Sequence, residues 1–170
     1  VANRTDFDLQ AHIDESGKKL TYFDHQAGEH VVPYVIEPSL GVDRALLAFL
    51  VDAYREEEVD GNSRVYLDLH PELAPVKVAI FPLAKKEPIQ KIARDIEDKL
   101  KRFYNVQYDE SGSIGKRYRR QDEIGTPYCI TVDFDSLDDN QVTVRDRNTL
   151  EQDRIDIDKV EEYLRNKFGF

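Results

Sequence analysis

The chain has 170 residues, of which 40% are hydrophobic and 34% are charged, a composition typical of a folded globular protein rather than a disordered one. No stretch of about 20 apolar residues could span a bilayer, and no apolar leader opens the chain. The single cysteine, Cys129, excludes an internal disulfide framework and favours a buried core thiol in a cytoplasmic protein without membrane contact. Because methionine is absent at every position, including the first, we expect the chain to be an internal piece of a longer gene product.

The net charge of −10 is unevenly distributed along the chain. Residues 1–60 carry 5 Lys/Arg and 13 Asp/Glu, whereas residues 61–170 carry 19 and 21. Four of the cations of the second part fall within five residues, Lys116–Arg120 (KRYRR). An acidic total argues against a general nucleic-acid binder, but this local concentration of cations indicates a possible phosphate-contacting surface.

The first predicted elements belong to residues 1–58. A helix is favoured between Thr5, its expected N-cap, and Gly17, although the alternation of apolar residues there also fits a strand. Two short strands, Lys18–Phe23 and Val31–Ile36, follow. A helix is then expected from Ser39 to Val51, and it should be buried because nearly every face is apolar.

The second predicted domain covers residues 76–170, after a boundary in the region 57–75, where we take residues 59–75 as a linker. Strands alternate there with helices, which predicts an α/β fold with a mixed sheet. The linker itself carries a short predicted strand, Arg64–Leu69. The predicted strands of the domain are Val76–Leu83, Val106–Tyr108, Tyr128–Phe134, Val142–Arg145 and Leu150–Ile155, and the helices are Pro88–Tyr104, Ile114–Ile124 and Asp158–Phe168, the last capped by Asp158.

Arg44 is the most unusual residue for its expected position, in the first turn of an apolar helix. The N-terminus of a helix carries about +0.5 of a charge, so a cation there is unfavourable unless an anion is present. Backbone N–H groups and a guanidinium together suit a phosphate, and Gly41 would let the ligand approach closely. The alternative is an internal ion pair of Arg44 with Asp43 or another carboxylate.

Three other features have both a functional and a plain structural interpretation. Glu37 and Ser39 could hold a ligand ammonium group, but such residues are common in loops. The run Ser111–Lys116 resembles a phosphate loop, yet Glu110 stands where a glycine is required and Arg117 where Ser or Thr is required.

The basic run Lys116–Arg120 suits RNA phosphates, with Tyr118 available for base stacking. The alternative is a solvated helix face paired with Asp122 and Glu123. The four histidines show no metal-ligand spacing, and no serine has a believable His/Asp partner, so the residues predict no metal site and no hydrolase.

Several motifs in chain order resemble class II aminoacyl-tRNA synthetases of the dimeric glycyl type. Glu37–Arg44 (EPSLGVDR) resembles their third signature motif, and Ser111–Tyr128 matches the central signature of their anticodon-binding domain. Further similar segments are Asn3–Leu9, Tyr22–Asp24, Leu69–Val78 and Val142–Arg147. The resemblance implies the end of an antiparallel-sheet catalytic domain in residues 1–58 and an anticodon-binding domain in residues 76–170.

The resemblance also implies a reaction: ATP activates glycine, and the glycyl group passes to tRNA(Gly). It implies a homodimer and ATP with Mg²⁺ in the complete enzyme, with Arg44 as the catalytic residue at the terminal phosphate. Within this chain the implied glycine-binding residues are Glu37, Pro38, Ser39, Leu40 and Gly41, the ATP-binding residues are Gly41, Val42, Asp43 and Arg44, and the RNA-binding residues are Lys116, Arg117, Tyr118, Arg119 and Arg120.

The first two family motifs are absent from the sequence, so we expect this piece alone to be inactive. The alternative is a non-catalytic, synthetase-like RNA-binding or accessory protein. Retention of Glu37 and Arg44 argues against that alternative, because a binding module has no need of an ATP-facing turn.

Overall fold

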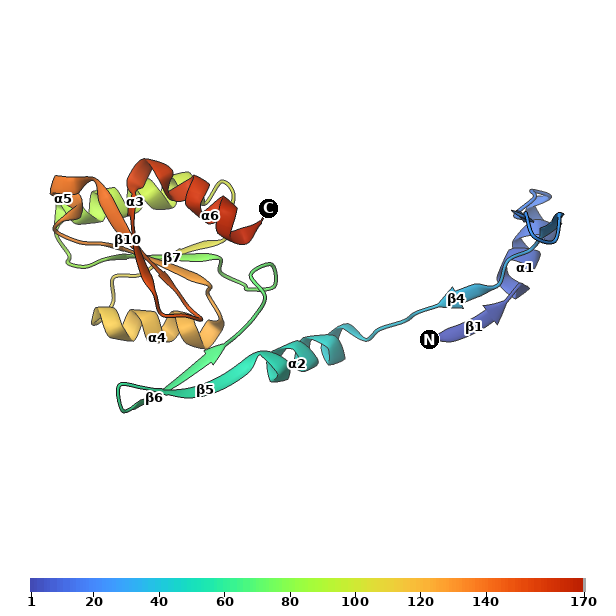
Figure 1. Cartoon of the computed structure of the whole chain (residues 1–170), viewed down its shortest axis with the longest axis horizontal. Coiled ribbons are helices and arrows are strands. Elements are labelled where there is room, and N and C mark those ends of the chain that lie inside the picture. The colour runs from blue at the N-terminus through green and yellow to red at the C-terminus, as the bar shows by residue number, and fades with distance from the viewer. Residues whose placement is uncertain (170) are drawn as a thin grey trace. The chain divides into compact units, whose positions relative to one another are not determined.

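A computed structural model describes residues 1–169 of the chain (Figure 1). Its internal contacts separate two units, Val1–Leu46 and Leu47–Phe170. Helix α2 (Val42–Ala53) contains the division, and each unit is described by itself.

The first unit consists of two antiparallel strand pairs and one helix. Strand β1 (Ala2–Thr5) pairs with β4 (Val35–Glu37), and β2 (Tyr22–Asp24) pairs with β3 (Glu29–Val31). The predicted helix is confirmed as α1 (Phe7–Ser16).

The ends of α1 were predicted with mixed success. The helix ends at Gly17, as expected, with φ of 66°. The expected cap at Thr5 is wrong, because Thr5 closes β1 with a positive φ of 54° and no side chain caps the helix. An ion pair from Arg4 to Asp8, at 2.7 Å, instead spans the start of the helix.

Helix α2 was expected to be buried, and the structure corrects this expectation. Val42 is 81% exposed, Leu47 63% and Phe49 50%, and only Ala53 at the end of the helix is buried. The helix forms because its residues are good helix formers, but the described residues supply no surface that covers its apolar side chains. Such an exposed apolar helix is typical of a surface that another part of a protein covers.

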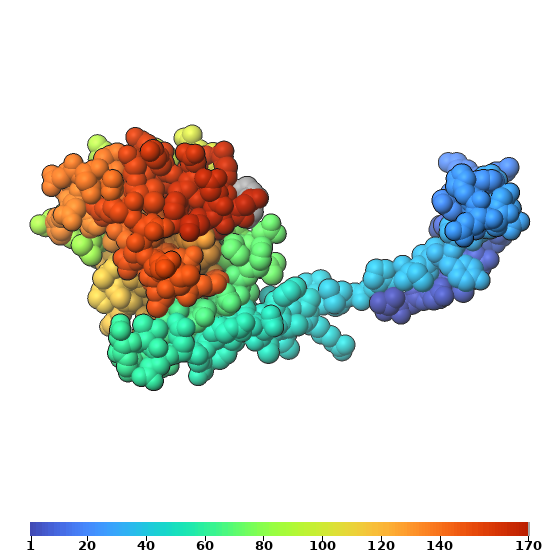
Figure 2. Space-filling view, viewed as in Figure 1, coloured from blue at the N-terminus to red at the C-terminus, as the bar shows by residue number. Residues whose placement is uncertain are grey.

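A hairpin follows α2 in the second unit, and only its second strand was predicted, as Arg64–Leu69. Strand β5 (Tyr54–Val59) pairs antiparallel with β6 (Asn62–Leu67) through a tight turn at Asp60 and Gly61, which both have positive φ. Residues 59–75 are therefore not a free linker. They contain β6, which lies against helix α4 (Ile114–Ile124), as Figures 1 and 2 show.

The α/β domain is confirmed, and its five-stranded sheet is mixed. The spatial order is β11 (Gln152–Asp156), β10 (Gln141–Asp146), β9 (Tyr128–Val132), β7 (Val78–Pro82) and β8 (Val106–Tyr108). Strand β7 runs parallel to both of its neighbours, whereas β10 is antiparallel to β9 and to β11.

Helices cover both faces of this sheet, so strands β7 and β9 are buried on both sides. Helices α3 (Glu87–Leu100) and α6 (Val160–Phe168) pack on one face over a core that includes Ile80 and Ile130. Helix α4 packs on the other face over Phe81 and Cys129 (Figure 1). This alternation of neighbouring residues between faces is the period of two expected for a strand.

Three predicted details of this domain differ from the structure. Helix α3 ends at Leu100, so Phe103 lies beyond it and is exposed. Asp158 does not cap α6; the side chain of Asp156 instead accepts the N–H of Asp158 in a short 3₁₀ turn, Ile157–Lys159. A one-turn helix, α5 (Ser136–Asp139), was not predicted.

Candidate nucleic-acid interface

Helix α4 carries the basic run, and one of its faces is buried although it is polar. Arg117 is 4% exposed, and Gln121 and Asp122 are also buried. The helix ends at Gly125, whose φ of 81° suits glycine, and its N–H closes the last turn. The basic run therefore has an inward side and an outward side.

Asp122 is the centre of a buried ionic cluster, which we call the Asp122 network (Glu57, Arg64, Asp122 and Arg145). Arg64 donates Nε to Asp122 Oδ2 at 2.9 Å, and Arg145 donates both terminal nitrogens to the two carboxylate oxygens at 3.0 and 3.1 Å. Glu57 accepts from Arg64 Nη1 at 2.5 Å. Because charges are buried at high cost unless paired, this network fixes the β5–β6 hairpin to α4 and β10.

Arg147 makes a second connection between distant segments. It donates Nη1 to the carbonyl of Gly125 at 2.6 Å and Nη2 to the carbonyl of Leu69 at 3.0 Å and to Asp68 Oδ1 at 3.1 Å. Its own carbonyl accepts from Arg64 Nη2 at 2.6 Å. Segments about 80 residues apart along the chain are thus held together by arginines that do not face solvent.

Arg117 and Tyr118 were expected to contact RNA, and the structure corrects that expectation for both. The guanidinium of Arg117 donates to three carbonyl oxygens, those of Pro82 at 2.6 Å, Gly112 at 2.9 Å and Glu110 at 3.3 Å. It is used to shape the loops after β7 and β8.

The ring of Tyr118 packs edge-on against Phe81, its hydroxyl is 2.6 Å from Thr131 Oγ1, and the guanidinium of Arg145 lies 4.6 Å from the ring centroid. Burial raises the pKa of Tyr118. A ring in these surroundings cannot receive a stacked base.

The outward side of α4 keeps three of the predicted cations. Lys116 and Arg120 are exposed, and Arg119 is half-buried. Arg120 forms an ion pair with Asp109. Burial by itself raises the pKa of Asp109, but the hydrogen bonds from Arg120 and from the N–H of Ser111, together with the charges of Arg120 and Arg117, outweigh it and lower the pKa. Phosphate contact by α4 therefore depends on Lys116, Arg119 and Arg120.

Residues of a neighbouring loop, which were not predicted from the sequence, extend this surface. Because β7, β8 and β9 are parallel, their carboxyl ends meet at one edge of the sheet, where ligands of α/β proteins bind. Lys85 and Lys86 follow β7 there and are exposed. Lys86 Nζ lies 4.9 Å from the ring centroid of Phe134, an exposed aromatic that follows β9. A lysine pair directly after an apolar strand was the available signal.

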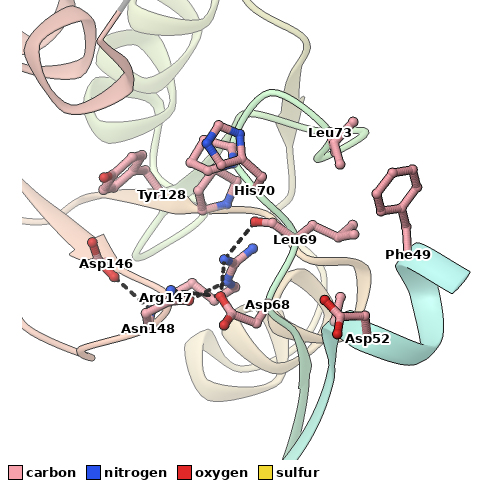
Figure 3. A pocket seen from close by; sticks show the side chains of 13 residues that line it. Phe49, Asp52, Asp68, Leu69, His70, Leu73, Tyr128, Asp146, Arg147 and Asn148 are labelled. Carbon is pink, nitrogen blue, oxygen red and sulfur yellow. Dashed lines mark hydrogen bonds and ion pairs between the residues drawn. The ribbon is translucent and has the colours of Figure 1, made fainter.

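A pocket of about 470 Å³ lies in another part of the second unit (Figure 3). Phe49 and Asp52 line it from the end of α2, and Asp68 and Asp146 add two further carboxylates. Its arginine, Arg147, is already occupied by protein groups. Three carboxylates repel phosphate, so this pocket does not suit an RNA backbone.

The predicted substrate segment, residues 37–44, lies in the first unit and is exposed. Arg4 Nε is 3.6 Å from Glu37 Oε2, a weak ion pair across the β1–β4 ladder. Gly41 directly precedes α2, and its carbonyl accepts the N–H of Ala45 at 3.0 Å. Arg44 has no ion pair among residues 1–169, with Asp43 or with any other carboxylate.

Cys129 is buried on the α4 side of the sheet, as expected for a core thiol, and burial raises its pKa above the ordinary value. A thiol of this kind is protonated and unreactive near neutral pH. Within residues 1–169 no group of three His, Cys, Asp or Glu side chains could hold a metal ion. No helix in that part of the chain has the length and apolar character to cross a bilayer.

Comparison with known proteins agrees with this architecture. The chain is 61% identical over 170 residues to glycine–tRNA ligase of Caldanaerobacter subterraneus subsp. tengcongensis, and 56% identical over 168 residues to that of Clostridium acetobutylicum. These matches cover 100% and 98% of this chain but 36% of each relative. The chain therefore spans little more than a third of the length of the curated relatives it matches.

A solved structure shows the same fold. Prolyl-tRNA synthetase from Cryptosporidium parvum, crystallised with L-proline and AMP, is 25% identical with a TM-score of 0.57, over 61% of this chain and 22% of that one. The family model for the anticodon binding domain matches residues 77–167, more than half of the chain. The chain thus belongs to the family of anticodon-binding domains.

Proposed function

We propose that this chain is the C-terminal part of a glycine–tRNA ligase and that residues 76–170 bind the anticodon region of tRNA(Gly). The observation that carries the proposal is 61% identity to one such ligase across the whole chain, including the segment before the anticodon-binding domain. Fold alone would not suffice, because one fold serves many functions.

The surface at the carboxyl ends of β7, β8 and β9 supports RNA binding by its chemistry. The α4 cations Lys116, Arg119 and Arg120, together with Lys85 and Lys86, provide positive charge in a protein whose net charge is −10. Cations attract the phosphate backbone, and the exposed ring of Phe134 can stack on an unpaired base.

For the complete enzyme we propose ATP-dependent activation of glycine followed by transfer to tRNA(Gly). Residues 37–41 would hold glycine, and residues 41–44 would line the ATP site, with Arg44 on the terminal phosphate. The guanidinium of Arg44 supports this assignment, because it is exposed in the first turn of α2 and has no ion pair among residues 1–169. Such a group stabilises charge that develops during phosphoryl chemistry rather than moving a proton.

Other features of the complete enzyme belong to the same proposal. It would act in the cytoplasm, where tRNA is charged, as a homodimer that uses ATP with Mg²⁺. Because residues 1–169 show no metal-binding cluster, we assign no residue of this chain to Mg²⁺.

The RNA surface can be tested with the isolated chain. We expect replacing Lys116, Arg119 and Arg120 by alanine to weaken binding of tRNA(Gly) and to lower the salt slope of log K by about one for each phosphate that is no longer bound. A control triple variant at Lys99, Lys101 and Arg102 removes the same charge. These residues lie between the last turn of α3 and the start of β8, at the amino ends of the parallel strands. Equal effects of the two triple variants would contradict the location of the surface.

The ATP role of Arg44 requires the complete enzyme. Replacing Arg44 by alanine should reduce glycine-dependent ATP–pyrophosphate exchange by about 100-fold or more, the scale seen when one stabilising donor is removed. Lys19→Ala, an exposed cation of the same unit, is the control. Normal exchange in Arg44→Ala would reject the phosphate role.

The same assay distinguishes this proposal from the alternative, a non-catalytic accessory protein. Glycine-dependent ATP–pyrophosphate exchange by the wild-type complete protein excludes that alternative.

A further inference from the structure

A hydrogen-bonded carboxylate lies at the end of β8, within the cationic surface described above. Glu110 follows the strand by two residues, and its Oε2 accepts from the hydroxyl of Tyr108 at 2.7 Å and from Nε2 of Gln90 on α3 at 2.8 Å. The guanidinium carbon of Arg94 lies 3.4 Å from the centroid of the Tyr108 ring, which restrains that tyrosine. The carboxylate is therefore held by two side chains, of which Tyr108 is itself restrained by Arg94.

The other carboxylate oxygen, Oε1, has no hydrogen-bond partner among residues 1–169. Glu110 is half-buried, so this oxygen is left with unused acceptor capacity at the surface. The hydrogen bonds from Gln90 and Tyr108 lower the pKa of Glu110, with a further contribution from the charges of Lys85 and Arg94, so the group is ionised at neutral pH.

A fixed anion is out of place on a surface that binds phosphate. It repels the RNA backbone, and a surface evolved for backbone contact alone has no use for it. A carboxylate does, however, accept hydrogen bonds from the amino groups of bases, as Glu and Asp do with cytosine N4. Unpaired bases in RNA loops are read in this way, on their Watson–Crick edges.

We propose that Glu110 is a base-reading residue, accepting a hydrogen bond at Oε1 from the N4 amino group of an unpaired cytosine. The assignment rests on the proposed function, since glycine codons all begin with two guanines and the matching anticodons therefore carry two adjacent cytosines. Uridine presents O4, a lone-pair acceptor, at the place of the amino group and is repelled by the carboxylate. Gln90 and Tyr108 are positioning residues that hold the carboxylate in register.

The competing interpretation is that Glu110 only connects β8 to α3. The two interpretations are distinguished by a substitution that keeps the hydrogen bonds to Gln90 and Tyr108 but replaces the free acceptor, Oε1, by a hydrogen-bond donor. In Glu110→Gln the amide oxygen can accept from Gln90 and Tyr108 as before, which places the NH₂ where Oε1 was. The variant then offers a donor to uridine O4 instead of an acceptor to cytosine N4.

The experiment measures binding of the full 170-residue chain to short RNA hairpins of one stem. One loop carries two adjacent cytosines, and in two other loops either cytosine is replaced by uridine. The wild type is expected to prefer cytosine at one of the two positions, and Glu110→Gln should lower that preference by about fivefold, a loss at the lower end of the range for one base contact. Tyr108→Phe, which removes one bond that holds the carboxylate, should lower it less.

Glu123→Gln is the matched control, because it removes one exposed carboxylate from the far end of α4. Glu123→Gln should strengthen binding to all the RNA hairpins equally and leave the preference for cytosine unchanged. Thermal unfolding of each variant, followed by circular dichroism, checks that the fold is intact.

Each result decides the assignment. A cytosine preference that falls by less than twofold in Glu110→Gln, or a wild type without any preference, overturns it while leaving RNA binding intact. Wild-type protein that binds none of the hairpins and no tRNA(Gly) overturns the proposed function and the assignment with it.

Discussion

Neighbouring arginines on one turn of a helix serve quite different purposes in this molecule. Arg117 is 4% exposed and holds loop carbonyls, whereas Arg120 is exposed and forms an ion pair with Asp109. The sequence predicted the helix and its basic character but not this division. The inward face of α4 follows helical spacing at Ile114, Arg117, Tyr118, Gln121 and Asp122, but a hydrophobic pattern cannot detect it because three of these side chains are polar or charged.

The Asp122 network makes a prediction at the scale of one residue. Asp122→Asn should lower the free energy of unfolding by about 3–5 kcal/mol, because it leaves Arg64 and Arg145 buried without their counter-charge. Urea unfolding followed by circular dichroism measures the loss. The exposed neighbour Glu123→Gln should change the stability by no more than about 0.5 kcal/mol. A loss below about 1 kcal/mol in Asp122→Asn would contradict a structural role for the network.

At the scale of elements, strand β5 and its pairing with β6 are the largest feature that the sequence pattern did not indicate. Asp60-Gly61 is a strong turn signal. Strand β5, which precedes this turn, could not be recognised because it contains the charged run from Arg55 to Glu58. Strand β6 contributes Arg64, one of the most buried side chains of the chain. A pattern of hydrophobic alternation does not recognise β5, because its four middle residues are all charged.

The contact between β6 and the end of α4 predicts different costs for two glycines. A Cβ at Gly125 would lie 3.0 Å from the carbonyl oxygen of Leu67 and 3.0 Å from Leu69 Cδ1, whereas at Gly112 it would meet only Lys116 Cδ at 3.9 Å. Both glycines have positive φ, 81° and 76°. Gly112→Ala should therefore cost about 1 kcal/mol of backbone strain, and Gly125→Ala about 1–3 kcal/mol more for the overpacking. Equal costs in urea unfolding would show that the hairpin does not press on α4.

At the scale of the whole molecule, the α/β domain was predictable, but the attachment of the residues that precede it was not. The alternation of strands and helices after residue 76 indicated the main elements because most of them bury an apolar face. Residues 59–75 are more than a linker, since they are attached to this domain by polar groups that are distant in sequence. The sequence also could not show that α2 would be exposed, because an apolar helix has the same sequence pattern whether or not another part of the protein covers it.

The contribution of residues 47–75 to the stability of the α/β domain can be tested by truncation. A piece covering residues 47–170 should be more stable than one covering residues 76–170 by several kcal/mol, because the shorter piece loses Arg64 and leaves Asp122 with Arg145 alone. Thermal and urea unfolding of the two pieces measure the difference. If the free energies of unfolding of the two pieces differ by less than about 1 kcal/mol, residues 59–75 are only a linker.

The complete burial of Asp122, at 0% exposure, has a practical consequence for handling the protein. Mobile ions screen charges that face water but scarcely reach a pair enclosed by protein. Concentrated sodium chloride in a chromatography buffer should therefore strip co-purified RNA from the outer cations while the hairpin stays anchored. The eluted material should remain folded and ready to bind again once the salt is dialysed away.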